Sequence, residues 1–531
     1  MKFWENIYEK GEKEMEKKNN FFVGNEDWIT EEIDTNNRKK YFDKIKLFLK
    51  KYLLLDNVNF LFGTGSSLHL GAESIQGIPE KILRDIEESE YKDLFKKFKK
   101  IYEEKILKDM REKIVSGKDY FIWENKINNL TPKLKDKIES EITKIKIEKE
   151  KISLKKILEE DSLSLEEEEK KEILKLGVEV KLEDFLNYLY AIKYLMERSE
   201  GLIQNFDNFS LKYKDLENLI QAIKKSLFEM CDIDKIKLDD NKFFKNNKND
   251  EIKKIMEIEG KYTYHKSFLT SLLQRPLNLR RANIFTLNYD LAFEYACDEL
   301  AIQYINGFVG FNERNFRPEV YNYDFFYPGD TTEGRVKRIE RVIKYYKLHG
   351  SLNWVYKKEN SNNPYGLYET PIELVRNKLK EEKENNLGDI MIYPTSSKKE
   401  YTLNFPYSEL FRKFADRLQQ PESVLFVVGY SFYDEHINDI IYQALANPSF
   451  TLIIVDYYGT KNGGEILRLS KLKDPRVIIS QGTYLGDFKV FSKELLPIME
   501  QEDTRRKVMV SLEALFSEEK NQGAEECLVE K

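Results

Sequence analysis

The chain has 531 residues, of which 41% are hydrophobic and 34% charged, so it can bury a sizeable core and is not an intrinsically disordered polymer. Its 87 Lys and Arg side chains against 93 Asp and Glu give a net charge of −6, which excludes a general basic field for nucleic acid. The cysteines Cys231, Cys297 and Cys527 form no C-x-x-C pair, which excludes a four-thiolate zinc site. We expect two or three domains.

The N-terminal residues 1–36 are mixed and polar, and we expect them to form an extension consisting of a helix followed by a loop. The first residues, Met1–Glu5, lack the apolar core of a signal peptide. No run of about 18 apolar residues occurs in the sequence, so no membrane span is expected. These features predict a cytoplasmic protein that neither contacts a membrane nor binds nucleic acid directly.

Residues 37–79 predict a helix, a strand and a glycine turn. Apolar side chains recur at helical spacing from Asn37 to Leu55, and the buried strand Val58–Phe62 follows. The turn comes next and reads Gly63-Thr64-Gly65-Ser66-Ser67. Glycines allow the backbone to approach a diphosphate closely, although a glycine turn without a ligand is an equally good reading. The turn is not the dehydrogenase fingerprint, because Leu68 occupies the position of the third glycine.

Residues 80–282 are rich in charge and poor in strand signals, and we expect an all-helical insertion domain. Apolar residues recur at steps of three and four in two stripes, which are Leu134, Ile138, Ile142 and Ile145, and then Leu182, Phe185, Leu189, Ile192 and Met196. Ser164 is expected to cap a helix whose first turn carries the acidic run Glu166–Glu169. That run could be a binding surface, but a solvated helix face is the favoured reading.

Strands return in residues 283–500. The expected strands are Asn283–Leu287, Ile343–Leu348, Asp389–Tyr393, Val424–Val428 and Thr451–Val455. Helical stretches such as Asp290–Leu300 and Tyr407–Leu418 lie between them. The alternation predicts an α/β fold with a mostly parallel, doubly wound sheet covered by helices on both faces. Phe491–Met499 and Thr504–Glu518 are expected to form terminal helices, and residues 501–531 a C-terminal helix and tail.

Several expected strands end in polar groups or glycine. Asn288 and Asp290 follow one strand, His349-Gly350-Ser351 follows another, and Gly429-Tyr430-Ser431 follows a third. In open α/β sheets ligands bind beyond the carboxyl ends of the strands, so one shared site is expected there. A lone histidine is more often structural than catalytic. Only the polar groups and glycines that follow the other expected strands favour a catalytic role for His349. Asp434 is favoured as a helix N-cap, while Asp456 suits a ribose or a turn equally well.

Together these motifs resemble the sirtuin fold, and more closely the bacterial sirtuin-like proteins of anti-phage defence. The carrying residues are Gly63-Thr64-Gly65-Ser66-Ser67 with Gly77-Ile78-Pro79, Thr286-Leu287-Asn288-Tyr289-Asp290, Lys347-Leu348-His349-Gly350-Ser351 and Gly429-Tyr430-Ser431-Phe432. The resemblance covers roughly residues 40–90 and 283–500. It implies a Rossmann-type domain made of residues 37–79 and 283–500, with residues 80–282 inserted.

The resemblance also implies which residues bind NAD. The turn of Gly63, Thr64, Gly65, Ser66 and Ser67 would bind the diphosphate. Asn288 and Asp290 would hold the nicotinamide ribose, and these two residues together with His349 would be catalytic. Gly429, Tyr430 and Ser431 would meet the phosphate or adenosine side, and Asp456 stands where sirtuins usually carry an asparagine that contacts the adenosine ribose. No cysteine lies between Cys297 and Cys527, so the sirtuin zinc ribbon is absent and no metal is expected.

The resemblance implies hydrolysis of NAD to nicotinamide and ADP-ribose by the effector of an abortive-infection system. It implies a homo-oligomer and a partner or trigger, which could be a HerA-type hexameric ATPase, a nucleotide-sensing protein or a phage protein. Two alternatives remain open, namely a non-catalytic module that binds NAD or ADP-ribose and an ADP-ribosyltransferase.

Overall fold

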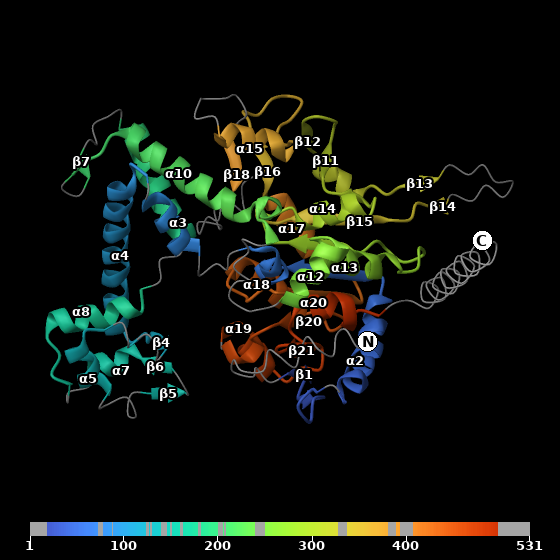
Figure 1. Cartoon of the computed structure of the whole chain (residues 1–531), viewed down its shortest axis with the longest axis horizontal. Coiled ribbons are helices and arrows are strands. Elements are labelled where there is room, and N and C mark those ends of the chain that lie inside the picture. Colours follow the sequence, from blue (N-terminus) through green and yellow to red (C-terminus); the bar gives the residue numbers. More distant parts are fainter. Residues whose placement is uncertain are drawn as a thin grey trace, which may run out of the picture. The chain divides into compact units, whose positions relative to one another are not determined.

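The computed structural model describes residues 19–497 except 35, 73–77, 88, 124–126, 128–129, 140–145, 149–150, 160–162, 179–181, 200–204, 207–208, 239–249, 328–336, 381–388, 393–406 and 463. The chain divides into two compact units (Figure 1). The first unit comprises Met1–Ile75, Phe228–Tyr393 and Lys398–Lys531, and the second comprises Gln76–Leu227 with Pro394–Ser397. The predicted terminal helix Thr504–Glu518 and the motif residue Gly77 lie outside the described residues.

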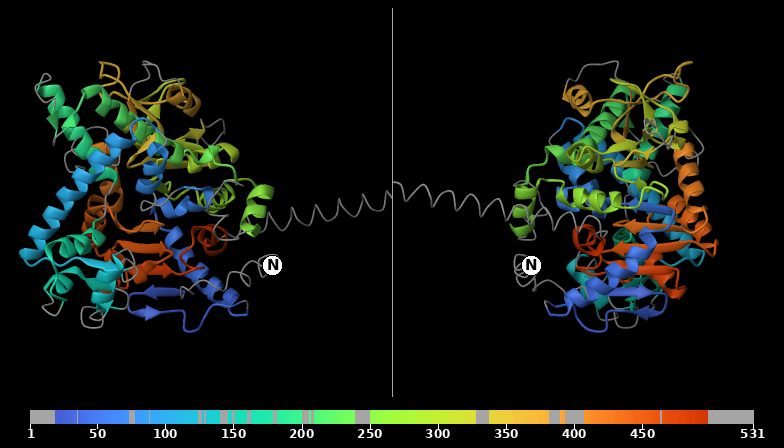
Figure 2. Two further views of the ribbon diagram at one scale, coloured as in Figure 1. Left: turned by 60° about the vertical axis from the view of Figure 1, so that its left-hand side comes forward. Right: turned by 90° about the vertical axis from the view of Figure 1, so that its right-hand side faces the viewer.

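The first unit is built on a nine-stranded sheet. In spatial order its strands are β10 (Gln303–Ile305), β15 (Val342–Lys347), β9 (Asn283–Thr286), β3 (Asn57–Phe62), β19 (Ser423–Val428), β20 (Thr451–Asp456), β21 (Val477–Gln481), β1 (Asn20–Val23) and β2 (Glu26–Asp27). Neighbouring strands from β10 to β21 are parallel, and β1 and β2 add antiparallel pairs at one edge. Figure 2 shows blue N-terminal strands beside orange C-terminal ones, although they are far apart in the sequence.

Alternation of side chains explains why this sheet is covered on both faces. Along β19, Val424, Phe426 and Val428 belong to one buried cluster, while Leu425 and Val427 belong to another. Successive side chains of a strand point to opposite faces, so a continuous apolar run buries both. Helices α2 (Arg38–Leu53), α13 (Thr263–Leu273) and α14 (Ala292–Glu299) contribute to the first cluster, and α17 (Tyr407–Leu418), α18 (Glu435–Leu445) and α19 (Gly464–Lys471) to the second. The predicted doubly wound, mostly parallel sheet is confirmed.

The order of the strands creates a reversal point in this sheet. The chain forms β3, then β9 beside it and β15 beyond β9, and afterwards places β19, β20 and β21 successively on the opposite side of β3. On each side of β3, strands that come later in the sequence lie farther from β3. In open α/β sheets such a topological switch point leaves a crevice at the carboxyl ends, here between β3 and β19.

A second, antiparallel sheet in the same unit consists of β11 (Phe308–Val309), β12 (Arg314–Phe316), β17 (Leu367–Glu369), β16 (Gly350–Tyr356) and β18 (Asp389–Ile392). Of the expected strand Asp389–Tyr393, the described residues Asp389–Ile392 form a strand, but it lies outside the parallel sheet. At Gly350 the φ angle is +101°, so the chain turns sharply after β15 and continues as β16. A two-stranded ribbon of β13 (Phe326–Tyr327) and β14 (Lys337–Arg338), the helix α15 (Ile372–Lys380) and the helix α12 (Asp250–Glu259) complete this part.

The second unit is mainly helical, but the expectation of an all-helical domain is wrong. Its helices are α3 (Ile78–Glu87), α4 (Lys92–Val115), α5 (Pro132–Glu139), α7 (Leu154–Glu159), α8 (Glu167–Leu176), α9 (Leu182–Arg198) and α10 (Tyr213–Cys231), and the unit ends inside α10. The strands β4 (Phe121–Trp123), β6 (Lys151–Ser153) and β5 (Lys146–Glu148) form a small antiparallel sheet, and β7 (Asn205–Phe206) pairs with β8 (Phe209–Ser210). Strands β5 (KIE) and β6 (KIS) each contain a single isoleucine between polar residues, so neither strand shows an apolar run.

Three further details differ from the sequence expectations. The N-cap of α8 is Glu166, which forms a capping box with Glu169, and Ser164 has a φ of +42° instead of a capping conformation. Residues Asn20–Val23 were expected in a helix and loop but form β1. The expected helix Phe491–Met499 is replaced by a short helix α20 (Phe488–Val490) and a π-helix over Phe491–Leu495. Within the described residues, none of the helices is long and apolar enough to cross a membrane.

Candidate functional site

Four parallel strands end together at the carboxyl edge of the large sheet. Phe62 of β3 is paired with Thr286 of β9 and with Val428 of β19, and Thr286 is paired with Lys347 of β15. Two residues beyond this row the chain reaches Thr64, Asn288, His349 and Tyr430 respectively. The polar groups predicted from separate motifs therefore follow adjacent strands at one edge, and Asn288 and His349 follow neighbouring strands.

The turn after β3 forms two short 3-10 helices, Thr64–Ser66 and Leu68–Leu70. Its backbone N–H groups are largely used inside the protein. Gly63 donates to Val428 O, Gly65 to Gly429 O, Ser66 to Gly63 O and Ser67 to Thr64 O, at 2.9–3.0 Å. These four amides are thus engaged in holding the turn, and the side chains of the turn are its main polar groups for a ligand.

The glycines of this turn are required by a close approach of two backbone segments. A Cβ on Gly63 would lie 2.5 Å from Gly429 O, and a Cβ on Gly65 would lie 2.6 Å from the Gly429 Cα. Gly429 itself has a φ of +65°, and a Cβ there would lie 2.7 Å from the Gly65 Cα. Real Cβ atoms do not approach backbone atoms this closely, so the loops after β3 and β19 can touch only because glycine occupies all three positions.

Asn288 is anchored to the turn through its side-chain amide. Its Nδ2 donates to Gly63 O at 3.1 Å and lies 3.2 Å from both Ser66 Oγ and Ser67 Oγ. A carbonyl oxygen can only accept, so the contact with Gly63 fixes which end of the amide faces the turn. Among the described residues no partner of Asn288 Oδ1 is found, so this half-buried oxygen is available as an acceptor for a ligand.

Asp290 occupies a supporting position behind this amide. Its side chain is buried, and Oδ1 accepts from Ala292 N at 3.0 Å at the start of α14. Burial raises the pKa of Asp290 above its ordinary value, while the nearby Lys347 ammonium and hydrogen bonds from Ala292 and Ser67 oppose the shift. The residue was predicted to be catalytic, and the structure places it one layer below the accessible edge.

Lys347 and Glu294 form a buried ion pair beneath the same edge. Lys347 Nζ lies 2.9 Å from Glu294 Oε1 and also donates to Asp290 O, and the hydroxyl of Tyr345 donates to Glu294 Oε2 at 3.1 Å. Burial raises the pKa of Glu294, again opposed by the Lys347 ammonium. Lys347 therefore ties the segment after β9 to β15 and keeps the two strand ends that carry Asn288 and His349 together.

His349 contacts a carboxylate from another loop. Its Nε2 lies 3.0 Å from Asp434 Oδ2, and the two side chains are 13% and 7% exposed. Asp434 is also the predicted N-cap of α18, because Oδ1 accepts from His436 N at 3.0 Å. The prediction of an N-cap is confirmed, but the contact of the second carboxylate oxygen with His349 was not predicted from the sequence.

The loop Gly429–Asp434 is fixed by internal hydrogen bonds. The Tyr430 hydroxyl accepts from Asp434 N at 2.9 Å and lies 3.0 Å from Asn438 Oδ1, while Asn438 Nδ2 donates to Phe432 O at 2.8 Å. Phe432 has a φ of +58°, a left-handed conformation that is costly for a bulky residue. The buried Tyr430 side chain thus stabilises the loop, whereas Ser431 is exposed at the edge.

Asp456 at the end of β20 takes the role of a turn residue. Its Oδ1 accepts from Tyr458 N at 3.0 Å and from Gly459 N at 2.6 Å. The side chain is only 5% exposed. Of the two readings open from the sequence, a turn or a ribose ligand, these hydrogen bonds favour the turn.

Solvent exposure divides the predicted site residues into two groups. Those at least partly accessible are Thr64, Gly65, Asn288, His349, Gly429 and Ser431, and those buried are Gly63, Ser66, Ser67, Asp290, Tyr430 and Asp456. The accessible residues cluster on the loops after β3, β9, β15 and β19, on both sides of the switch point. The buried residues hold those loops in place.

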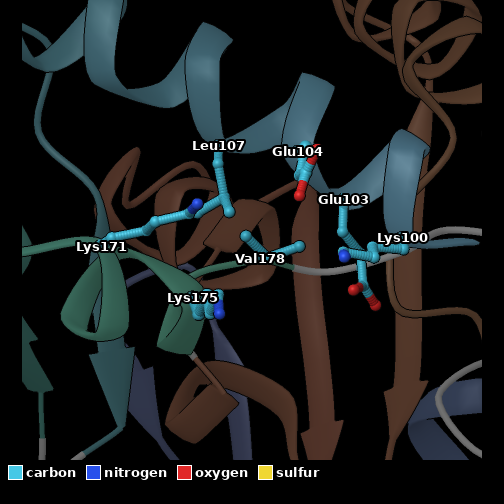
Figure 3. Close-up of a pocket in the computed structure, with 7 residues that line it drawn as sticks. All are labelled: Lys100, Glu103, Glu104, Leu107, Lys171, Lys175 and Val178. Atoms are coloured by element: carbon cyan, nitrogen blue, oxygen red, sulfur yellow. The ribbon is translucent and has the colours of Figure 1, made fainter. Parts of the chain in front are cut away.

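A separate surface pocket of about 430 Å³ lies inside the second unit (Figure 3). Its lining comes from α4 and from the stretch of α8 to Val178, and consists of Lys100, Glu103, Glu104, Leu107, Lys171, Lys175 and Val178. None of the predicted site residues contributes to it. In the part of the chain that the structure describes, no group of three or more His, Cys, Asp or Glu could hold a metal ion.

Comparison with known protein families identifies a SIR2-like domain at residues 282–468. This range begins at the residue before β9 and ends within α19, so it includes Asn288, His349, Asp434 and Asp456, while the Gly63–Ser67 turn lies outside it. No curated protein matches the chain. SIR2-like domains are associated with NAD-related chemistry. The family match and the sirtuin resemblance of the sequence motifs therefore point to the same general chemistry.

Proposed function

We propose that this protein is an NAD glycohydrolase, in which water replaces nicotinamide at C1′ of its ribose to give nicotinamide, ADP-ribose and a proton. The observation that carries the proposal is the placement of Asn288 and His349, which follow neighbouring strands beside the switch point and lie within the SIR2-like range. The carboxyl edge at a switch point is the expected position for a dinucleotide in a sheet of this topology.

The residues of the edge suit a reaction that passes through an oxocarbenium-like state. As the nicotinamide leaves, positive charge develops on the ribose ring, and the acceptor oxygen of Asn288 is a group that favours positive charge. Asn288 Oδ1 would orient the attacking water or a ribose hydroxyl. His349 would accept the proton that this water or hydroxyl loses.

The glycine turn contributes to binding in a way that differs from the sequence expectation. Because four of its amides and the amide of Gly429 donate within the protein, we assign contact with the diphosphate to the hydroxyls of Thr64 and Ser431. Glycine at Gly65 and Gly429 keeps Cβ atoms out of the narrow space between the two loops. The glycines therefore serve the contact between the two loops that carry Thr64 and Ser431.

We further propose that NAD hydrolysis serves as the effector step of an anti-phage abortive-infection system in the cytoplasm. The supporting evidence is the resemblance of four ordered motifs to bacterial sirtuin-like defence proteins, whose NAD depletion halts host metabolism. In such a system the enzyme is silent until triggered, and a homo-oligomer together with a HerA-type ATPase, a nucleotide sensor or a phage protein would provide the control. Cellular NAD should fall during infection only when His349 is intact.

One assay separates the proposed activity from its alternatives. Full-length protein, alone and with the product of its neighbouring gene, is incubated with NAD labelled in the adenylate. Free nicotinamide with ADP-ribose supports hydrolysis, unchanged NAD supports a binding module, and label on a macromolecule supports an ADP-ribosyltransferase. His349→Ala and Asn288→Ala should each lower turnover by roughly 10²-fold or more. His436→Ala is the matched control, because this histidine is half-buried at the same edge but its ring has no assigned role.

A further inference from the structure

The contact between His349 and Asp434 joins two loops that their strands hold apart. In the sheet, β9 and β3 lie between β15, which precedes His349, and β19, which precedes Asp434. Three strand spacings amount to roughly 14 Å. Nevertheless, His349 Nε2 and Asp434 Oδ2 are 3.0 Å apart. The two loops therefore converge over the ends of the intervening strands, where Thr64 and Asn288 are located.

The carboxylate of Asp434 is held in a fixed orientation. Oδ1 accepts from His436 N at 3.0 Å, and the backbone N–H of Asp434 donates to the Tyr430 hydroxyl at 2.9 Å. With one oxygen on the helix terminus, Oδ2 is the oxygen that faces His349. Both side chains are mostly buried, so the contact is weakly screened by water.

An ordinary helix cap does not require this arrangement. Asp487 caps α20 in the same chain, with Oδ1 accepting from Lys489 N and Oδ2 lying 2.6 Å from Lys489 Nζ. That carboxylate satisfies its helix terminus and a neighbouring lysine and reaches no histidine. The second oxygen of Asp434 is directed instead across the sheet edge to the one histidine that follows a strand of the row.

We propose that Asp434 is a positioning residue for His349, an inference that rests on the proposed NAD hydrolysis. The Asp434 carboxylate lies 3.0 Å from Nε2 and favours the protonated, positively charged ring. When the imidazole accepts a proton from water or from a ribose hydroxyl, the imidazolium that forms is paired with this carboxylate. The proton is later released to solvent, and the ring returns to its neutral form.

Asp434→Asn is the variant that tests this role with least damage to the fold. Asparagine is as good an N-cap as aspartate and has the same size, so α18 should remain capped while the charge is lost. We expect kcat for nicotinamide release to fall by roughly 10- to 100-fold, within the contribution of general base catalysis, with little change in KM. Asp487→Asn is the matched control and should leave kcat unchanged.

A second readout does not depend on activity. The chain has four histidines, so the ring signals of protein labelled at histidine can be assigned by single substitutions and followed against pH by NMR. Around His349 the structure places the Asp434 carboxylate and the Phe411 ring, at a centroid distance of 6.4 Å. Loss of the carboxylate should move the protonation midpoint of His349 to lower pH by about one unit or more, and Asp487→Asn should not move it.

The two readouts separate the inference from the proposed function. If wild-type protein releases no nicotinamide under any condition, the proposed hydrolysis fails, and the titration still shows whether Asp434 holds the imidazole. An unmoved midpoint in Asp434→Asn overturns the inference whatever the activity. Equal or higher turnover in Asp434→Asn also overturns it, because the contact would then restrain the site instead of preparing it.

Discussion

Two glycines with nearly equal positive φ angles allow the effect of the close contact between the loops to be measured. Gly429 and Gly464 have φ angles of +65° and +64°. A Cβ at Gly429 would lie 2.7–2.9 Å from backbone atoms of Gly65 and Ser66, whereas a Cβ at Gly464 would meet nothing within 4 Å. Alanine at either position suffers the same left-handed strain, and only Gly429→Ala adds a collision between the loops after β3 and β19.

The expected magnitudes follow from these two terms. Left-handed backbone costs alanine about 1–2 kcal/mol, which should be the whole effect of Gly464→Ala. A collision with backbone atoms that cannot turn aside adds about 1–3 kcal/mol at Gly429, as for other overpacked positions. In a domain of this size each kcal/mol lowers the midpoint of thermal unfolding by roughly 2–4 °C.

Scanning calorimetry on the full chain provides the comparison. The same transition is followed in the wild type, Gly429→Ala and Gly464→Ala, because units of the chain can unfold separately. Gly429→Ala should have the lower midpoint by several degrees and should also lose NAD turnover, whereas Gly464→Ala should keep it. Equal midpoints for the two variants would refute the view that the glycines exist for contact between the loops.

Two further substitutions test the interior beneath the site. His265 is fully buried, and burial lowers its pKa to about 3. As the pH falls below about 6.5, the histidine is protonated in the unfolded chain before it is protonated in the folded one. The free energy of unfolding therefore decreases by about 1.4 kcal/mol per pH unit between about pH 6.5 and the folded-state pKa. His265→Phe should therefore narrow the difference in unfolding free energy between pH 7.5 and pH 5 by about 2 kcal/mol in urea titrations, and an unchanged difference would contradict this. Lys347→Met leaves Glu294 buried and without its ammonium partner, and it should lower the free energy of unfolding by about 3–5 kcal/mol in the same titration at pH 7.5. Adding Glu294→Gln should restore part of this free energy. A decrease below about 1 kcal/mol would argue against a buried ion pair.

The parallel sheet could be predicted because its strands carry their own signal. Val424–Val428 and Thr451–Val455 are apolar runs long enough for strands buried on both faces, and the structure has both. Asn20–Val23 was missed because a strand of four residues depends on its partners β21 and β2. The small sheet of the second unit was missed for the same reason, since three strands of three residues each are too short to show a local pattern.

The candidate site was predictable as far as strand ends determine it. Asn288 and His349 share an edge because parallel strands end on the same side, which the sequence indicates directly. The contact of His349 with Asp434 was not predictable, because the path of two loops over the sheet edge depends on tertiary packing. The glycines of the turn indicated a close approach, but the sequence could not show that the partner of Gly65 is the backbone of Gly429.

The most direct test of the account is a structure of the full chain with a hydrolysis-resistant carbocyclic analogue of NAD. We expect the analogue to lie across the switch point, with its nicotinamide ribose beside Asn288 and His349 and its diphosphate between the Thr64 and Ser431 loops. An analogue bound elsewhere in the molecule, or one that leaves this edge vacant at millimolar concentration, would contradict it.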